Sequence, residues 1–256
     1  MIKGSKIRKA DHQIEPLLLD RWSPRAMSGE EISQEELMRL FEAARWAPSS
    51  FNTQQWRALY AGRGTEHWQT FFDLLVEANK AWAKNAAVLV VFISRKLFDH
   101  DNEPSVTHSY DCGAAWENFA LQGFHQGLVV HGMQGFDYEQ ARKELRVPEE
   151  FQVEAMAAVG RPGPKELLPE TLQARESPND RRKVSESVFE GPFKLNRFWP
   201  NDRPQRRIRG GRSSDPKQRS ASARHGERGA DQHHPAKSRH KRFGDCATDQ
   251  LLCSGV

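Results

Sequence analysis

The feature that most limits how this chain can fold is an uninterrupted apolar stretch from residue 86 to residue 93. Its sequence, Ala-Ala-Val-Leu-Val-Val-Phe-Ile, is rich in β-branched residues and carries no charge. A strand with this pattern is buried on both faces of a sheet. The stretch is too short to cross a bilayer as a helix, which takes about 20 apolar residues. It therefore predicts a buried strand of a soluble protein and no membrane span.

Helical and strand patterns surround this stretch and predict an α+β fold. Ser33 and Glu36 have the spacing of a capping box, which predicts a helix that runs to about Trp46. Pro48 disfavours helical geometry at the residue before it, so this helix should end by Ala47. The spacing of apolar residues also predicts helices over 66–83, over 109–126 and after Asp137, and strands over 57–61, at the start of 127–136 and over 151–159.

Charge divides the chain into a body, residues 1–196, and a tail, residues 197–256. The tail has 14 Lys and Arg against 6 Asp and Glu, whereas the body has 24 against 28, so the basic character belongs to the tail. The tail has few aromatic residues and no apolar period, and such a segment cannot bury enough surface to offset its chain entropy. We expect one folded domain followed by a disordered, basic, low-complexity tail.

Cysteine and histidine usage gives no sign of a metal centre. Cys112, Cys246 and Cys253 have neither the pairing of a disulfide framework nor the CxxC spacing of a metal site. Together with the absence of a signal-type apolar stretch in residues 1–20, this predicts a cytoplasmic protein. His233, His234, His240 and the tail cysteines are too irregularly spaced to favour a metal cluster. The tail also lacks the aromatic interleaving of a nucleic-acid stacking platform, so no specific nucleic-acid partner is expected.

Two short polar stretches are the candidate binding segments. In Arg21-Trp22-Ser23-Pro24-Arg25, two arginines four residues apart suit a phosphate, since guanidinium groups bind phosphate oxygens bidentately. The other reading is a solvated basic turn. In the stretch from Ala47 to Arg57, hydroxyl and amide side chains would suit a flat ligand with many acceptors, or would simply close a turn on their own backbone.

The stretch from Ala47 to Arg57 resembles the Pro-Ser-Ser-x-Asn-x-Gln-Pro-Trp signature of the nitroreductase family, FMN-dependent flavoproteins that use NAD(P)H. Residues 21–25 resemble that family's Arg-x-Ser-x-Arg/Lys motif, and residues 172–176 resemble its late basic motif. The likeness extends over about residues 11–195. It implies a central mixed, mainly antiparallel sheet flanked by helices and a homodimer with FMN at its interface.

The resemblance also implies a set of cofactor-binding residues. Those that would hold the phosphate and ribityl chain are Arg21, Trp22, Ser23, Arg25 and Arg175. Those that would reach the ribityl chain and ring edges are Pro48, Ser49, Ser50, Asn52 and Asn79, and those that would lie against the ring are Met133, Gln134 and Gly135. The chain departs from the family pattern at Gln55, Trp82 and Gln173, which stand where proline, lysine and a first cation are usual.

Other assignments stay open at this point. His131 suits a substrate pocket or plain packing, Asn79 suits the flavin edge or a helix surface, and Cys112 is more typical of a small buried hydrophobe than of a reactive thiol. The chain has no Gly-x-Gly-x-x-Gly, Walker or Gly-x-Ser-x-Gly motif.

The function implied by the resemblance is hydride transfer from NADH or NADPH through FMN to a small electron-poor acceptor, a nitroaromatic or quinone, by a ping-pong mechanism. A flavoprotein of the same fold with different redox chemistry, such as dehydrogenation or dehalogenation, is one alternative. An interaction protein that acts through its basic tail is the other.

Overall fold

The computed structural model describes residues 1–193, which are built around a four-stranded sheet in the order β1-β2-β4-β3. The strands are β1 (Trp56–Gly62), β2 (Val88–Arg95), β3 (Val129–Met133) and β4 (Phe151–Gly160). Every neighbouring pair is antiparallel, so that Val90 lies opposite Tyr60 on one side and Ala157 on the other. The predicted mainly antiparallel sheet is confirmed, and within residues 1–193 no parallel pair occurs.

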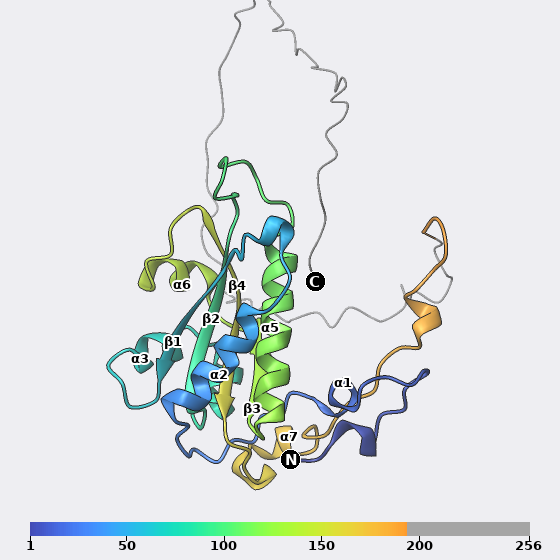
Figure 1. Ribbon diagram of the computed structural model, residues 1–256. Helices are drawn as coiled ribbons and strands as arrows, with labels where there is room; N and C mark the ends of the chain where they lie inside the picture. Colours follow the sequence, from blue (N-terminus) through green and yellow to red (C-terminus); the bar gives the residue numbers. More distant parts are fainter. Residues whose placement is uncertain (194–256) are drawn as a thin grey trace, which may run out of the picture. The chain divides into compact units, whose positions relative to one another are not determined.

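Helices cover both faces of the sheet (Figure 1). One face carries α2 (Gln34–Arg45) and α5 (His108–His125), and the other carries α3 (Trp68–Asp73), α4 (Glu77–Ala83) and α6 (Tyr138–Glu144). The side chains of β2 alternate between these two layers. Val88, Val90 and Phe92 pack in the α2/α5 layer, whereas Leu89, Val91 and Ile93 pack in the other. The strand is therefore buried on both faces, as its sequence predicts.

The start of α2 follows directly from the sequence. Ser33 Oγ accepts a hydrogen bond from the backbone N–H of Glu36 at 3.1 Å, and Glu36 Oε2 accepts one from the backbone N–H of Ser33 at 2.8 Å. These bonds satisfy donors that a helix N-terminus otherwise leaves unpaired. The hydrogen bond from the Ser33 backbone and those from Arg161 lower the pKa of Glu36. The helix ends at Arg45, before Pro48.

The predicted helix over 66–83 is wrong in one respect, because it is two helices. Between α3 and α4 the backbone leaves the helical path and pairs with the segment that follows β3. Val76 N–H donates to the carbonyl of Gly135, and Asp137 N–H donates to the carbonyl of Leu74. These long-range bonds replace helical ones, so the apolar period of the sequence continues across a break in the helix.

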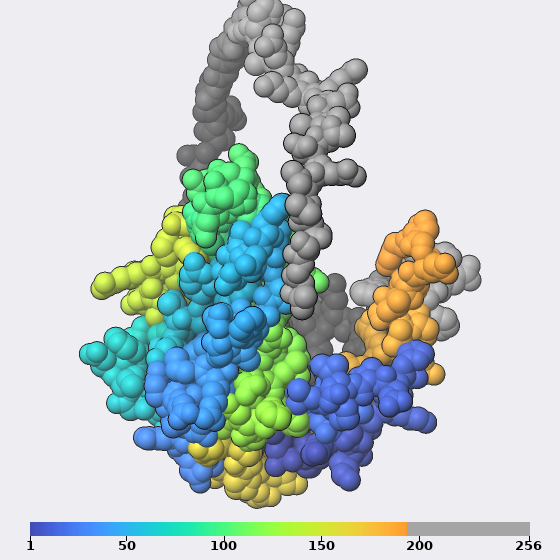
Figure 2. Space-filling model, in the orientation of Figure 1, coloured from blue at the N-terminus to red at the C-terminus, as the bar shows by residue number. Residues whose placement is uncertain are grey.

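The remaining elements are short. They are the helices α1 (Pro16–Asp20) and α7 (Glu170–Gln173) and the 3-10 turns η1 (Gly4–Lys6), η2 (Ser50–Asn52), η3 (Lys165–Leu167) and η4 (Val184–Glu186). The N-terminal segment lies beside the segment that follows α7 (Figure 2), and Arg8 Nε donates to the carbonyl of Asn179 at 2.8 Å. The predicted disordered tail, with its histidines and two cysteines, lies outside the described residues.

Cys112 lies on the buried face of α5 with 2% of its surface exposed. Burial, with smaller contributions from the charges of Glu154 and Asp111, raises the pKa of the Cys112 thiol to about 12. A thiol in this state is not a nucleophile, so the predicted role as a small buried hydrophobe is confirmed. Across residues 1–193, no helix has both the length and the apolar character that crossing a bilayer requires.

Candidate functional site

A cavity of about 480 Å³ lies between the segment after α1, strand β3 and the segment after α7. Its walls are formed by Arg8, Arg21, Trp22, Ser23, Arg25, His131, Gly132, Arg175, Ser177, Asn179 and Arg181. The five residues predicted to hold a phosphate and ribityl chain are all among them. Guanidinium and hydroxyl groups therefore converge from segments about 150 residues apart in sequence, which suits an anionic ligand. We call this cavity the cationic cavity.

Arg21 is the most constrained of the predicted arginines. Its Nε lies 3.3 Å from Glu117 Oε1 on α5, and its Nη1 lies 3.4 Å from Ser23 Oγ. The guanidinium carbon stands 5.8 Å from the centre of the Trp116 ring. With a side chain only 14% exposed, Arg21 presents its guanidinium in one defined place.

Arg8 and Arg181 also line the cavity, although neither was expected there from the sequence. Arg8 is buried, and its Nη1 donates to the carbonyls of Leu19 at 3.0 Å and Arg21 at 2.5 Å. Burial, followed by the charge of Arg181, lowers the pKa of Arg8. The basic run at residues 181–183 is a signal that could have identified Arg181, whereas nothing local to Arg8 indicates its role.

His131 both lines the cavity and packs tightly. Its Nδ1 lies 2.8 Å from the carbonyl oxygen of Pro24, so the neutral ring donates from Nδ1, and its ring lies 4.6 Å from the ring of Trp82. Burial, with smaller effects from the charges of Arg25 and Arg21, lowers the pKa of His131 to about 4. His131 is therefore neutral near pH 7.

This histidine gives the protein a pH dependence that can be measured on the apoprotein. Because the pKa is about 4 in the folded state and 6.5 ordinarily, only the unfolded chain takes up a proton between these values. The contribution of His131 to the free energy of unfolding should then fall by about 2 to 3 kcal/mol as the pH drops from 6.5 to 4. His131→Asn keeps a donor for the carbonyl of Pro24 but cannot titrate. Denaturant unfolding at several pH values should therefore show that the free energy of unfolding falls less between pH 6.5 and 4 in this variant than in the unaltered protein. An identical pH profile in the two proteins would contradict this assignment.

Gly132 lines the cavity on its β3 side, with the Trp116 ring packed against it, whereas Gly135 lies beyond the end of β3, against Asn79. A Cβ on Gly132 would lie 2.7 Å from the Trp116 ring, and a Cβ on Gly135 would lie 2.7 Å from Asn79 Nδ2, so neither position accepts a side chain without rearrangement. The Nε1 of Trp116 is buried and has no hydrogen-bond partner in the described part of the chain. A buried donor of this kind is normally satisfied, so it is consistent with a ligand acceptor beside it.

The residues predicted to lie against the flavin ring are the last residue of β3, Met133, and the first two residues of the loop after it, Gln134 and Gly135. Asn79 Nδ2 donates to the carbonyl of Gly135 at 3.0 Å, which ties α4 to this loop. Gln134 is exposed, whereas the side chain of Met133 is buried in the core below α4. Only the backbone of Met133 is therefore available to a ligand.

The predicted residues of the Pro48–Asn52 stretch form a separate group near the start of α5. Ser50 N–H donates to Asp111 Oδ2 at 3.0 Å, and Gln54 N–H donates to Ser49 Oγ at 3.0 Å. Pro48 and Asn52 are exposed. Ser49 thus closes a turn on the backbone, which is one of the two alternatives predicted for this stretch. The stretch does not line the cationic cavity.

This loop stores backbone strain. Phe51, Asn52 and Gln54 have φ values of 52°, 55° and 48°, a region that residues other than glycine seldom occupy. The ring of Phe51 is 80% exposed and lies edge-on to Phe98 at 5.7 Å. Such strain persists only where surrounding contacts hold it, and it is concentrated at functional sites.

The three departures from the family pattern have structural roles. Gln55 is buried, and its Nε2 donates to the carbonyl of Leu97 at 3.2 Å. Trp82 fills the core, where its ring packs at a tilted angle of 50° against that of His131, and Gln173 Nε2 donates to the carbonyl of Leu168 at 2.9 Å. None of the three lines the cationic cavity.

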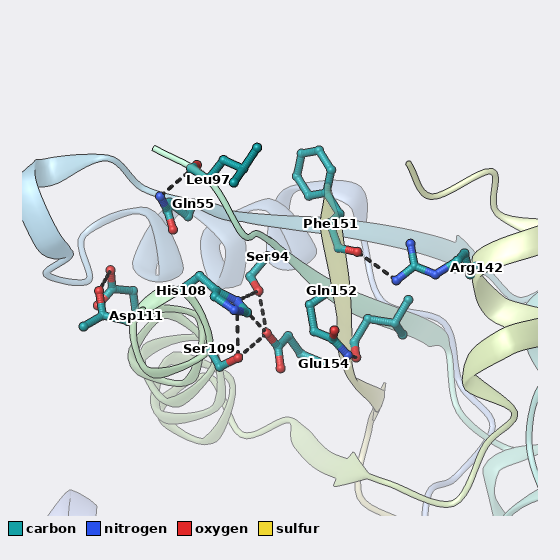
Figure 3. A network of polar contacts seen from close by, with 12 residues as sticks. Gln55, Ser94, Leu97, His108, Ser109, Asp111, Arg142, Phe151, Gln152 and Glu154 are labelled. Atoms are coloured by element: carbon teal, nitrogen blue, oxygen red, sulfur yellow. Dashed lines mark hydrogen bonds and ion pairs between the residues drawn. The ribbon is translucent and has the colours of Figure 1, made fainter. Parts of the chain in front are cut away.

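A polar cluster fastens the start of α5 to the sheet (Figure 3). Ser94 Oγ lies 2.7 Å from His108 Nδ1, and Ser109 Oγ donates to Glu154 Oε1 at 2.7 Å. Glu154 Oε1 also lies 3.4 Å from the same His108 Nδ1. A catalytic Ser-His-acid triad needs the serine and the acid on different ring nitrogens, so this cluster is an anchor for the helix. Within residues 1–193, no group of acidic, histidine and cysteine side chains could hold a metal ion.

Comparison with known proteins places this architecture in a family. The sequence model of the Nitroreductase family matches residues 18–161. A crystal structure described as an oxidoreductase containing FMN is 43% identical, with a TM-score of 0.71, over 73% of this chain and 96% of that one. The comparison with curated proteins gave no match.

More distant solved structures share the fold. One is a nitroreductase from Desulfovibrio desulfuricans in complex with FMN, at 23% identity and a TM-score of 0.55, over 71% of this chain and all (100%) of that one. Another is a nitroreductase family protein from Clostridium difficile 630, at 19% identity and a TM-score of 0.53, over 69% and 97%. Since the family model covers more than half of the 256 residues, the chain belongs to the nitroreductase family.

Proposed function

We propose that this protein is an FMN-dependent oxidoreductase that passes a hydride from NADH or NADPH through the flavin to a small electron-poor acceptor, of nitroaromatic or quinone type, in a ping-pong cycle. The observation that carries the proposal is the cationic cavity, which gathers Arg21, Trp22, Ser23, Arg25 and Arg175. Family membership and the FMN in the 43% identical oxidoreductase support it.

The residues present fit FMN. Arg21, Arg25 and Arg175 would hold the phosphate, and Ser23 the nearby ribityl hydroxyls. The backbone of Gln134 and Gly135, with the Asn79 side chain, would face the edge of the ring. The buried Trp116 Nε1 offers a donor that has no other partner among residues 1–193, and Gly132 and Gly135 leave room that side chains would fill.

In this proposal Ser49, Ser50 and Asn52 act on the flavin of a second copy of the chain. Their loop is fixed to the first turn of α5 through Asp111, apart from the cationic cavity of the same protomer. A homodimer with FMN at its interface would bring each loop to the partner's cavity. We infer a cytoplasmic setting, where NADH and NADPH are available.

The protein would contribute binding, orientation and electrostatics, while bound flavin supplies the redox chemistry. Cationic side chains at the phosphate end would anchor the cofactor. The neutral His131 adds no charge to a cavity that already holds several guanidinium groups. Backbone N–H groups after β3 would favour negative charge at the ring edge.

An absorption spectrum of the purified protein tests the proposal. We expect flavin bands that bleach when NADH or NADPH is added without oxygen and return when a nitroaromatic or quinone is added. A protein that holds no flavin and cannot be loaded with FMN would contradict the proposal. Bleaching without reoxidation by either acceptor class would support the same cofactor with different redox chemistry.

A further inference from the structure

A buried carboxylate lies directly behind the segment that carries Arg21 and Arg25. Glu176 Oε1 accepts hydrogen bonds from the backbone N–H groups of Arg25 at 2.7 Å and Ala26 at 2.8 Å. Its Oε2 is 4.0 Å from Arg25 Nη1 and accepts no hydrogen bond within the described residues. The side chain is only 5% exposed.

Glu176 does not share the cationic cavity. It lines a second cavity, of about 420 Å³, on the other side of the segment, together with Pro24 and Ala26. Its carboxylate therefore does not contact a ligand in the cationic cavity. A negatively charged carboxylate near a phosphate site weakens phosphate binding by Coulomb repulsion. The charge of Glu176 therefore does not explain why Glu176 lies here.

The hydrogen bonds of Glu176 help to hold the short segment at residues 24–27 in place. On one side of Arg25, the carbonyl of Pro24 accepts from His131 at 2.8 Å. On the other side, Met27 pairs with Pro162, and Gly163 N–H donates to the carbonyl of Ala26 at 2.9 Å. Glu176 supplies the acceptor for the N–H groups of Arg25 and Ala26, which have no other hydrogen-bond partner within the described residues and would cost free energy if left unpaired.

We propose that Glu176 is a positioning residue for the cofactor phosphate. It fixes the backbone at Arg25, restrains the Arg25 guanidinium through Oε2, and seats its neighbour Arg175 at the wall of the same cavity. This inference rests on the proposed function, because it takes the ligand of the cavity to be the FMN phosphate. The two motifs, far apart in sequence, are then joined by one side chain.

The test compares FMN with riboflavin, which has the same ring and ribityl chain but no phosphate. Both are titrated into the apoprotein and followed by quenching of flavin fluorescence. In Glu176→Ala the FMN dissociation constant should rise about tenfold to a hundredfold, while the riboflavin constant stays the same. Glu176→Gln keeps an oxygen for the two N–H groups and should show a smaller rise.

A matched control is Asp137→Ala, which also removes a carboxylate bonded to a backbone N–H, that of Gln140, but at the start of α6. It should leave the ratio of the two constants unchanged. An unchanged or tighter FMN constant in Glu176→Ala would overturn the inference. If Glu176→Ala does not fold, Glu176→Gln decides, because glutamine removes the negative charge that faces Arg25 Nη1. An unchanged ratio of the FMN and riboflavin dissociation constants in Glu176→Gln would then overturn the inference.

The failure of the proposed function gives a different result. If the unaltered protein binds riboflavin as tightly as FMN, the cationic cavity does not hold the phosphate, and the inference on Glu176 is overturned with it. If the unaltered protein prefers FMN and Glu176→Ala keeps that preference, only the role of Glu176 is lost.

Discussion

Replacing Arg21 by alanine is expected to weaken FMN binding by about tenfold to a hundredfold while the apoprotein stays folded. The guanidinium is held by Glu117 and Ser23 over the ring of Trp116, so it meets a phosphate without first losing side-chain entropy. Its removal takes this partner from Glu117, whose side chain is 40% exposed and can bind water, and from Ser23 and the Trp116 ring. Flavin content after purification and calorimetric titration of the apoprotein with FMN measure the effect.

Arg39→Ala is the matched control, because Arg39 is an exposed arginine on α2 that pairs with Glu35. It should bind FMN like the unaltered protein. Arg21→Lys should fall between the two, since a lysine keeps the charge but not the planar fork of donors. Equal flavin content in Arg21→Ala and the unaltered protein would rule out the phosphate assignment.

Replacing Asp111 by alanine should lower the free energy of unfolding by about 2 kcal/mol and loosen the strained loop at residues 49–54. Asp111 is buried, and its Oδ2 accepts from the N–H of Ser50 at 3.0 Å and from Thr107 Oγ1 at 3.4 Å. Without this acceptor the Ser50 N–H has no fixed partner, and the positive φ values that follow lose a restraint. Denaturant unfolding and hydrogen exchange at the Ser50 amide measure the two effects.

Asp111→Asn provides the comparison, because its amide oxygen can still accept from Ser50. Its stability and exchange rate should lie near those of the unaltered protein. FMN affinity should fall in Asp111→Ala and follow the exchange rate across the two variants. Unchanged protection of the Ser50 amide in Asp111→Ala would show that other contacts hold the loop.

Much of the fold was predictable because its determinants are local. The apolar run at residues 86–93 defines β2, and the capping box of Ser33 and Glu36 defines the start of α2. The break between α3 and α4 was not predictable, because it depends on backbone bonds to residues 135–137. An apolar period records which side chains are buried, and it says nothing about where the backbone finds its partners.

The candidate site divides in the same way. Arg21, Arg25 and Arg175 lie in motifs that a reader of the sequence can recognise, and the structure brings them to one cavity. Arg8, Asp111 and Glu176 act on segments far away in the chain, through hydrogen bonds that no local pattern encodes. The ligand-facing residues were therefore easier to predict than those that hold them in place.

Helix α5 has a consequence for laboratory evolution of this protein. Its buried face includes the small residues Cys112, Ala115, Ala120 and Gly123. A Cβ on Gly123 would lie only 2.4 Å from a methyl group of Val130. Because a helix moves as a rigid rod, added bulk there would displace Asp111 and Trp116 together. Random substitutions on this face would change cofactor retention and loop shape together. Few variants from such a library would then show which of the two changes caused an altered activity. Diversity directed to the exposed Phe51 and its neighbour Phe98 would leave that scaffold intact.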